Sequence, residues 1–356
     1  MRKSIYTLLS LLIAAFLIVA ILVLTAPAPN KQPNGFKRQY LEASPLPVTA
    51  TLPTGNNNIL DIAGADDSLY YFSVLRDPST IIASSLQANA IADTFRIELS
   101  PSFKDSVSEY FFTQYSNNRF FVYGYNIPSV CETGRAGNIR LPRQRSYNHG
   151  GFSQAQVLRD NQHFVLRKLH IQEKDQLFVR VTLDNDSLHM EKGLSTLHRD
   201  GGMSTDGAMT YDRTTGLLTY VYYYSNRFFT FDSTLQLVSS GHTLDTFSVS
   251  KFSIATNKDE KSQVYMNAGP DQMVNGFSCA DNGVLYVQAK LKADNDDERM
   301  FGKYTVIDMY EIKSGRYKGS SYLDIPARTK INQLFVKGDQ LLVHGETHIY
   351  LMKIAY

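Results

Sequence analysis

Turn-forming residues recur along this sequence at a nearly constant spacing, and each turn is followed by a short apolar run. Asp, Asn or Gly introduces "LYYF", "FVL", "LLTYV", "VLYV" and "LLV", and a weaker signal introduces "YFF". Turn formers followed by β-rich runs are typical of β-hairpins. The turns lie near Asp67, Asp105, Asn161, Thr215, Asn282 and Gly338. Five intervals from 67 to 338 give a repeat of about 54 residues.

A second series of turns has the same spacing. Each of its turns follows the strand that comes after a turn of the first series. They lie near Pro78, Asn117, Lys174, Asn226, Asn295 and Gly345, which gives a repeat of about 53 residues. On this interpretation "YSNNRFF" at 115–121 and "YYSNRFF" at 223–229 are the second hairpins of two units.

Six units of several short strands predict an all-β fold, a six-bladed β-propeller preceded by one N-terminal transmembrane helix. In "GLLTYVYYYSNRFFTFD" apolar residues occupy both faces of the strand, with Leu218 and Tyr220 opposite Leu217 and Val221. A sheet with one face in water alternates apolar with polar residues, so this sheet needs a neighbour on each side. A strand expected near 46–53 would complete the blade begun by the last hairpin. A pair of β-sandwiches is the alternative.

The N-terminus predicts export. From 8 to 24 only Ser10 is polar, and Arg2 and Lys3 precede the run. This length is near the lower limit for a membrane span and exceeds the usual core of a cleaved signal peptide, which remains the alternative. The basic flank stays in the cytoplasm. We expect a cytoplasmic tip at 1–6, a transmembrane signal-anchor at 7–25, a Pro-rich tether at 26–50 and the propeller at 51–356.

Composition excludes several classes of function. The net charge is +2 with basic residues spread along the chain, so no nucleic-acid partner is expected. The sequence has no P-loop, no dinucleotide fingerprint and no metal-ligand spacing, so we predict no cofactor and no metal. The absence of Trp counts against quinone-cofactor propellers. Cys131 and Cys279 form either one disulfide or two unrelated buried thiols.

A family resemblance adds a location. The stretches "GGMSTDGAMTYD", "YVYYYSNRFF", "LYVQAKL" and "VIDMYEIKSGRYKGSSYLDIP" resemble uncharacterised, membrane-anchored, propeller-like proteins of Gram-negative bacteria. The resemblance covers 190–356 well and 50–190 loosely. It implies a single-pass inner-membrane protein whose C-terminal domain lies in the periplasm. It implies no activity.

Propeller geometry selects the candidate binding residues. The strands of a blade run from A at the axis to D at the rim, and the B–C and D–A loops share one face, where ligand sites concentrate. The B–C loops carry Arg119, Arg227, Asp294, Asp296, Asp297 and His344, and the D–A loops carry His149, His198, Arg199, Asp200, Asp206, Asp271 and Asn275. The competing interpretation is that these polar turns are simply solvated.

Two functions follow from this face. The first is a tethered, non-catalytic module that binds a protein partner or a small ligand there. The second is an exported hydrolase or lyase at the channel mouth, with His149 or His198 as general base and an aspartate as acid or metal ligand. The stretches "DNDDE", "HGETH" and "GMSTDG" each lack the full spacing of a calcium loop, a metal pair or a nucleophile elbow.

Overall fold

The computed structural model of the chain describes residues 2–25, 33–41, 44–85, 90–107, 110–125, 127–134, 143–147, 151–185, 187–251, 254–259, 262–267 and 272–354. Two compact units divide the chain, one at Met1–Asn34 and the other at Gly35–Tyr356. The first unit holds helix α1 (Arg2–Thr25), whose described side chains are, apart from Ser10, apolar and mostly exposed. Within the part of the chain that the structure describes, no helix combines the length and the apolarity needed to cross a membrane.

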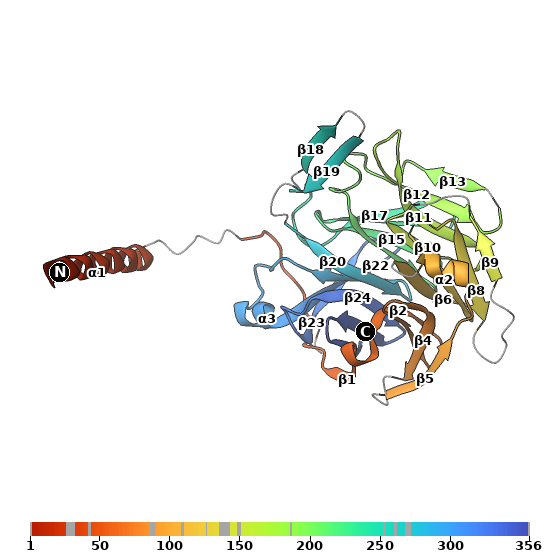
Figure 1. Cartoon of the computed structure of the whole chain (residues 1–356), viewed down its shortest axis with the longest axis horizontal. Coiled ribbons are helices and arrows are strands. Elements are labelled where there is room, and N and C mark those ends of the chain that lie inside the picture. The colour runs from red at the N-terminus through yellow and green to blue at the C-terminus, as the bar shows by residue number, and fades with distance from the viewer. Residues whose placement is uncertain are drawn as a thin grey trace. The chain divides into compact units, whose positions relative to one another are not determined.

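The second unit is a six-bladed β-propeller, which confirms the all-β, six-bladed part of the predicted fold (Figure 1). Each blade is a four-stranded antiparallel sheet. Blade 1 comprises β2 (Ile59–Ala65), β3 (Tyr70–Val74), β4 (Asp77–Ser85) and β5 (Ala90–Arg96), blade 2 comprises β6 (Phe111–Ser116), β7 (Arg119–Gly124), β8 (Ser129–Gly134) and β9 (Arg143–Ser146), and blade 3 comprises β10 (Gln154–Val157), β11 (His163–His170), β12 (Asp175–Thr182) and β13 (Leu188–Glu191).

The last blade is completed by a strand from the other end of the propeller. Blade 4 comprises β14 (Gly207–Asp212), β15 (Leu217–Tyr222), β16 (Arg227–Phe231) and β17 (Leu237–His242), blade 5 comprises β20 (Asn275–Asp281), β21 (Val284–Ala289), β22 (Tyr304–Glu311) and β23 (Tyr317–Pro326), and blade 6 comprises β24 (Ile331–Lys337), β25 (Gln340–Gly345), β26 (His348–Lys353) and β1 (Val48–Pro53). Strand β1 pairs antiparallel with β26, Ala50 opposite Leu351, so the predicted closure is confirmed.

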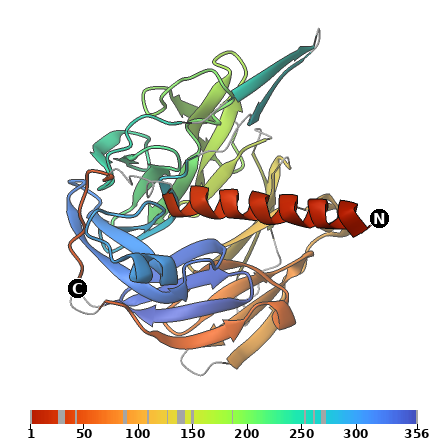
Figure 2. The ribbon, with the colours of Figure 1, turned by 90° about the vertical axis from the view of Figure 1, so that its left-hand side faces the viewer.

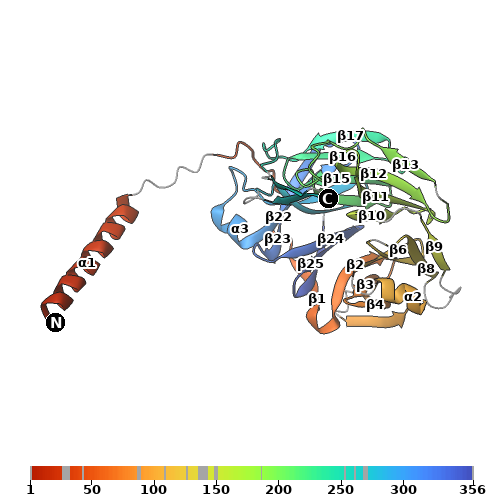
Figure 3. The same ribbon diagram turned by 45° about the horizontal axis from the view of Figure 1, so that its top comes forward.

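Shorter elements lie between the blades. They are the 3₁₀ turn η1 (Gly55–Asn57), the helices α2 (Pro101–Val107) and α3 (Glu298–Lys303), and the hairpin of β18 (Ile254–Asp259) and β19 (Ser262–Asn267). This hairpin extends away from the blades in both Figure 1 and Figure 2. Figure 3 shows the outer strands β13 and β17 on the rim of the ring.

Burial on both faces of each blade holds the ring together. Every residue of β15 is buried, as the apolar pattern of this strand predicts. Tyr220 packs in a cluster with Phe178 of blade 3, whereas Val221 packs in another cluster with Leu285 of blade 5. A blade without its neighbours would leave both of these faces in water, so the blades stabilise one another by burying large aromatic surfaces between them.

The predicted strand register is wrong in blade 2. Five turns of each series lie where they were expected, but Asp105 belongs to α2, and the A–B turn of blade 2 lies at Asn117 and Asn118. Both asparagines have positive φ, 46° and 62°, the geometry of a tight hairpin turn. The segment "YSNNRFF" is therefore an A–B hairpin, whereas "YYSNRFF" is a B–C hairpin. The error arises because α2, which buries Phe103 and Val107, occupies the place of a turn.

Residues 35–41 and 44–47, named here the N-terminal strap, run along the outer strand of blade 5. Tyr40 forms a parallel bridge with Ser320 of β23, and Leu46 forms one with Leu323. The segment predicted as the last part of an extended tether is thus packed against the propeller before β1 begins.

Candidate functional site

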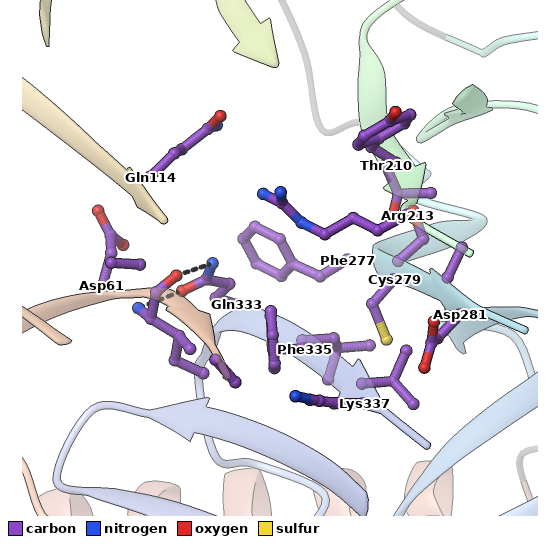
Figure 4. Close-up of a pocket in the computed structure, with 18 of the residues that line it drawn as sticks. Asp61, Gln114, Thr210, Arg213, Phe277, Cys279, Asp281, Gln333, Phe335 and Lys337 are labelled. Atoms are coloured by element: carbon purple, nitrogen blue, oxygen red, sulfur yellow. Dashed lines mark hydrogen bonds between the residues drawn. The ribbon is translucent and has the colours of Figure 1, made fainter. Parts of the chain in front are cut away.

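A cavity of about 1330 Å³ occupies the centre of the ring (Figure 4). Its wall takes residues from β2, β6, β10, β14, β20 and β24, which are the innermost strands of the six blades. The cavity is therefore the central channel of the propeller. No single blade forms it, so its shape depends on ring closure.

Three glutamines on inner strands join neighbouring blades around this channel. Each amide oxygen accepts a backbone N–H of the next inner strand, and each amide nitrogen donates to a carbonyl of that strand. Gln114 bonds Val157 and Ala155 at 2.8 and 2.9 Å, Gln154 bonds Met209 and Gly207 at 2.7 and 2.6 Å, and Gln333 bonds both groups of Ile62 at 2.8 and 3.1 Å. These interblade glutamines supply the bonds that a further strand would supply. Figure 4 shows the Gln333 pair as dashed lines.

Most charged side chains in the channel wall have a hydrogen-bond or ion-pair partner. Asp66 accepts a hydrogen bond from Tyr71, Asp67 pairs with Lys337, Asp206 pairs with Arg167, Asp281 accepts from the Gly338 amide, and Asp339 pairs with Lys353. The charged groups of Asp61 and Arg213, the two others, have no hydrogen-bond or ion-pair partner among the residues described.

Arg213 enters the channel from the turn that follows β14. Asp212, fully buried, fixes this turn by accepting the Thr214 N–H at 2.9 Å and the Gly283 N–H of blade 5 at 2.7 Å. The Arg213 guanidinium lies over the Tyr211 ring, 5.9 Å from its centroid, and points into the cavity (Figure 4). Burial lowers the pKa of Arg213. This is the response expected of a cation that has lost water without gaining a counter-charge.

Asp61 extends into the channel from β2, on the far side of the ring from Arg213. The Asp61 backbone N–H donates to the Ser73 hydroxyl at 3.2 Å, and the Asp61 carboxylate lines the cavity. Burial raises the pKa of Asp61 to about 6. At neutral pH the carboxyl is mostly ionised and accepts hydrogen bonds.

The predicted D–A loop of blade 4 does reach the channel, through Asp206. This carboxylate lies 3.1 Å from Arg167, and burial raises its pKa although the arginine opposes that effect. Arg167 is buried and also donates to the Gly202 and Thr205 carbonyls. Gly202 has φ +78°, and a Cβ there would lie 2.7 Å from Gln176, so this loop packs closely only with glycine at 202.

The other predicted residues of this loop form hydrogen bonds that fix the conformation of the loop. Asp200 is buried and accepts the N–H groups of Gly202, Met203 and Ser204. His198 is exposed, and its Nδ1 lies 2.6 Å from the Ser204 Oγ. The backbone N–H groups of His198 and Arg199 donate to Asp175. The polar groups that suggested a binding surface thus form the hydrogen bonds that stabilise this loop.

The remaining candidates are dispersed. Arg119, expected on a B–C loop, begins β7 after the A–B turn, lies on the opposite face and pairs with Glu132. Arg227 is exposed at the start of β16. Asn275 is buried and donates to the Tyr222 and Ser225 carbonyls, a contact between blades 4 and 5. His149 and Asp271 lie outside the described residues.

The aspartates of the B–C connection of blade 5 make structural contacts. Asp294 accepts the Gly35 N–H, Asp296 binds the strap residues Arg38 and Tyr40, and Asp297 caps helix α3.

His344 lies buried within β25 and not in a loop, and burial lowers its pKa to about 4.

Both cysteines are free thiols in the structure, and one of them, Cys279, lines the channel. Cys131 and Cys279 are both buried, and burial raises the pKa of the Cys131 thiol to about 11. Among the described residues, no group of three or more His, Cys, Asp or Glu side chains is arranged to hold a metal ion. The channel wall, as far as it is described, contains no histidine.

Comparison with known proteins gives information on the fold of the chain and none on its function. No family model and no curated protein matches the chain. A solved structure of a DUF4221 family member from Bacteroides vulgatus is 11% identical, with a TM-score of 0.55 over 89% of this chain and 96% of that one. This similarity shows a shared propeller-like fold.

Two further solved structures are less similar. The β-propeller domain of Cps50 (Swd1) from Myceliophteria thermophila is 11% identical, with a TM-score of 0.41 over 87% of this chain and 100% of that chain. An inactive virginiamycin B lyase from Staphylococcus aureus, solved with quinupristin, is 10% identical, with a TM-score of 0.44 over 90% of this chain and 99% of that chain.

Proposed function

We propose that this chain is a membrane-tethered, extracytoplasmic propeller that binds a small polar ligand in its central channel and catalyses no reaction. The observation that carries the proposal is the cavity of about 1330 Å³, to which every blade contributes its inner strand. Ligand pockets typically enclose about 300–1,000 Å³, so the channel has room for a whole small molecule. Asp206 from a D–A loop and Tyr223 from a B–C loop line the cavity. The A–B turns of blades 1, 4, 5 and 6 line it as well, through Asp67, Thr214, Asn282 and Gly338, so loops of both faces border the channel.

The tether in this proposal rests on the N-terminal sequence. The run from 8 to 24 contains one polar residue, and Arg2 and Lys3 precede it. An uncleaved helix in the inner membrane would hold the propeller in the periplasm, with the basic tip in the cytoplasm. The proposal includes an alternative in which the propeller binds a protein partner on its B–C/D–A loop face and holds no ligand in the channel.

Native mass spectrometry of the full chain, extracted from its own membranes in mild detergent, tests both parts. We expect an intact N-terminus and a bound small molecule. Thr210→Phe narrows the channel at a residue of its wall, so this variant should lose the bound mass. The matched control is Thr94→Phe, on the exposed outer strand β5, which should keep it.

Two outcomes contradict the proposal. If the wild-type chain carries no small molecule, and its melting temperature responds to no sugar, amino acid or carboxylate in a library, the channel is not a ligand site. If the chain is recovered in the soluble fraction with its first residues missing, the tether is a cleaved signal peptide.

A hydrolase at the channel mouth is the second candidate. The observation that favours it is the His198–Ser204 contact of 2.6 Å, in the same loop as Asp206. No described carboxylate bonds the His198 ring, so the pair lacks the third member of a triad. A fluorophosphonate probe should label wild type and the control Ser195→Ala but not Ser204→Ala. Absence of labelling in the wild type counts against this candidate.

A further inference from the structure

We propose that the channel ligand carries an oxyanion, a carboxylate or phosphate, and that Arg213 binds it while Asp61 binds a hydrogen-bond donor of the same ligand. This inference rests on the proposed function, because it names the chemistry of the ligand at that site. It is carried by the placement of the only two charged groups in the described channel wall that have no polar partner.

Arg213, which is partly buried in the channel wall, differs from the fully buried arginines of the same propeller. Arg38, Arg145 and Arg167 each form an ion pair with a carboxylate, at 2.6, 2.9 and 3.1 Å. Within the channel, Lys337 pairs with Asp67 at 3.1 Å. Removing a cation from water is costly unless a counter-charge or hydrogen bonds replace the lost hydration. In the described structure no residue supplies this for Arg213, so an anion from solution can.

The surroundings of Arg213 favour an anion. The ionisable groups that act on its charge are the phenols of Tyr211, Tyr115 and Tyr123, and no described carboxylate is among them. Phenols are neutral at physiological pH, so they do not neutralise the charge of the guanidinium. The guanidinium offers several N–H donors in one plane, a geometry that matches two oxygens of a carboxylate or phosphate.

Asp61 gives the ligand a second point of attachment. It belongs to blade 1 and Arg213 follows the inner strand of blade 4, three blades away in a ring of six, so the two groups face the channel from opposite walls (Figure 4). Buried Tyr123 lies within electrostatic reach of both groups, which act on its pKa in opposite directions. A ligand that contacts both walls needs an oxyanion at one end and a hydroxyl or ammonium group at the other.

Calorimetric titration of the full chain with sodium acetate, succinate, phosphate and sulfate, against chloride at matched ionic strength, tests the proposal. At least one oxyanion should bind wild type, and Arg213→Gln should weaken it by tenfold or more, because a charge-assisted pair is lost. Lys337→Gln, which removes a channel cation that already has a partner, should change the affinity less than threefold. Preference for succinate over phosphate identifies a carboxylate ligand, and the reverse order identifies a phosphate.

Equal oxyanion affinity in wild type and Arg213→Gln overturns the inference. So does binding confined to neutral compounds, an outcome that leaves the proposed channel function intact. If Arg213→Gln fails to fold, Arg213→Lys keeps the charge and loses the planar fork. It should then bind more weakly than wild type, and wild-type affinity in that variant also contradicts the proposal.

Discussion

At the scale of single residues, Asp61 makes stability depend on pH. Its folded-state pKa, about 6, lies above that of an unfolded aspartate, which is near 4. Between these values only the unfolded chain ionises, so folding stability falls as the pH rises from about 4 to 6, and the loss is complete above that. Asp61→Asn removes it. We expect this variant to be about 1–3 kcal/mol more stable than wild type at pH 8 and nearly equal near pH 4.

Urea unfolding of wild type and Asp61→Asn at both pH values measures this difference. Asp93→Asn, on the exposed outer strand of blade 1, is the control and should show no comparable gain at pH 8. A gain of the same size at both pH values would mean that Asp61 is destabilising for a reason other than its charge.

The sequence identifies part of the channel and misses the part that we consider decisive. Asp206 was predicted from its D–A loop and does line the cavity. Arg213 stands in "YDRTTG", where Asp212 and Gly216 signal a turn, but nothing local shows that the side chain faces the axis. Asp61 is one polar residue in an inner strand. Only closure of the ring brings blades 1 and 4 to face each other, and no local pattern encodes that.

At the scale of strands, the interblade glutamines make a prediction about ring stability. Gln333→Ala removes both bonds to the Ile62 backbone at the seam between blades 6 and 1. Backbone groups left without partners destabilise the fold, here by about 1–3 kcal/mol. Gln236→Ala, at an exposed position, should change stability by less than about 0.5 kcal/mol. Chemical unfolding distinguishes the two, and equal effects would show that the Gln333 bonds contribute nothing specific.

Strand periodicity predicts the number of blades, but not the register of each one. The turn signals are local, so they survive in five blades and fail where α2 replaces a turn before blade 2. That failure moved Arg119 to the wrong face. It also made two similar segments seem equivalent, although each only combines an Asn turn with an aromatic strand. Register requires the inner strand to be identified, and that strand is defined by contacts with other blades.

At the scale of the whole molecule, the strap should contribute strongly to stability. Arg38 is buried and bonds Asp296 at 2.6 Å and Asp308 at 2.8 Å. Arg38→Met leaves two buried carboxylates without their cation, and we expect a loss of about 3–5 kcal/mol in urea unfolding. Arg316→Met removes an exposed pair with Glu311 and should cost less than about 1 kcal/mol. Similar losses in both variants would contradict a stabilising role for the strap.

The course of the strap also determines how the molecule would respond to tension. A pull on the N-terminus is transmitted along the chain to the strap before it reaches β1. The strap runs parallel to β23, with bridges at Tyr40 and Leu46. A force along the strand direction therefore loads the hydrogen bonds between the strap and β23 at the same time. The strand that closes the ring is therefore shielded from the load until the strap has sheared off blade 5.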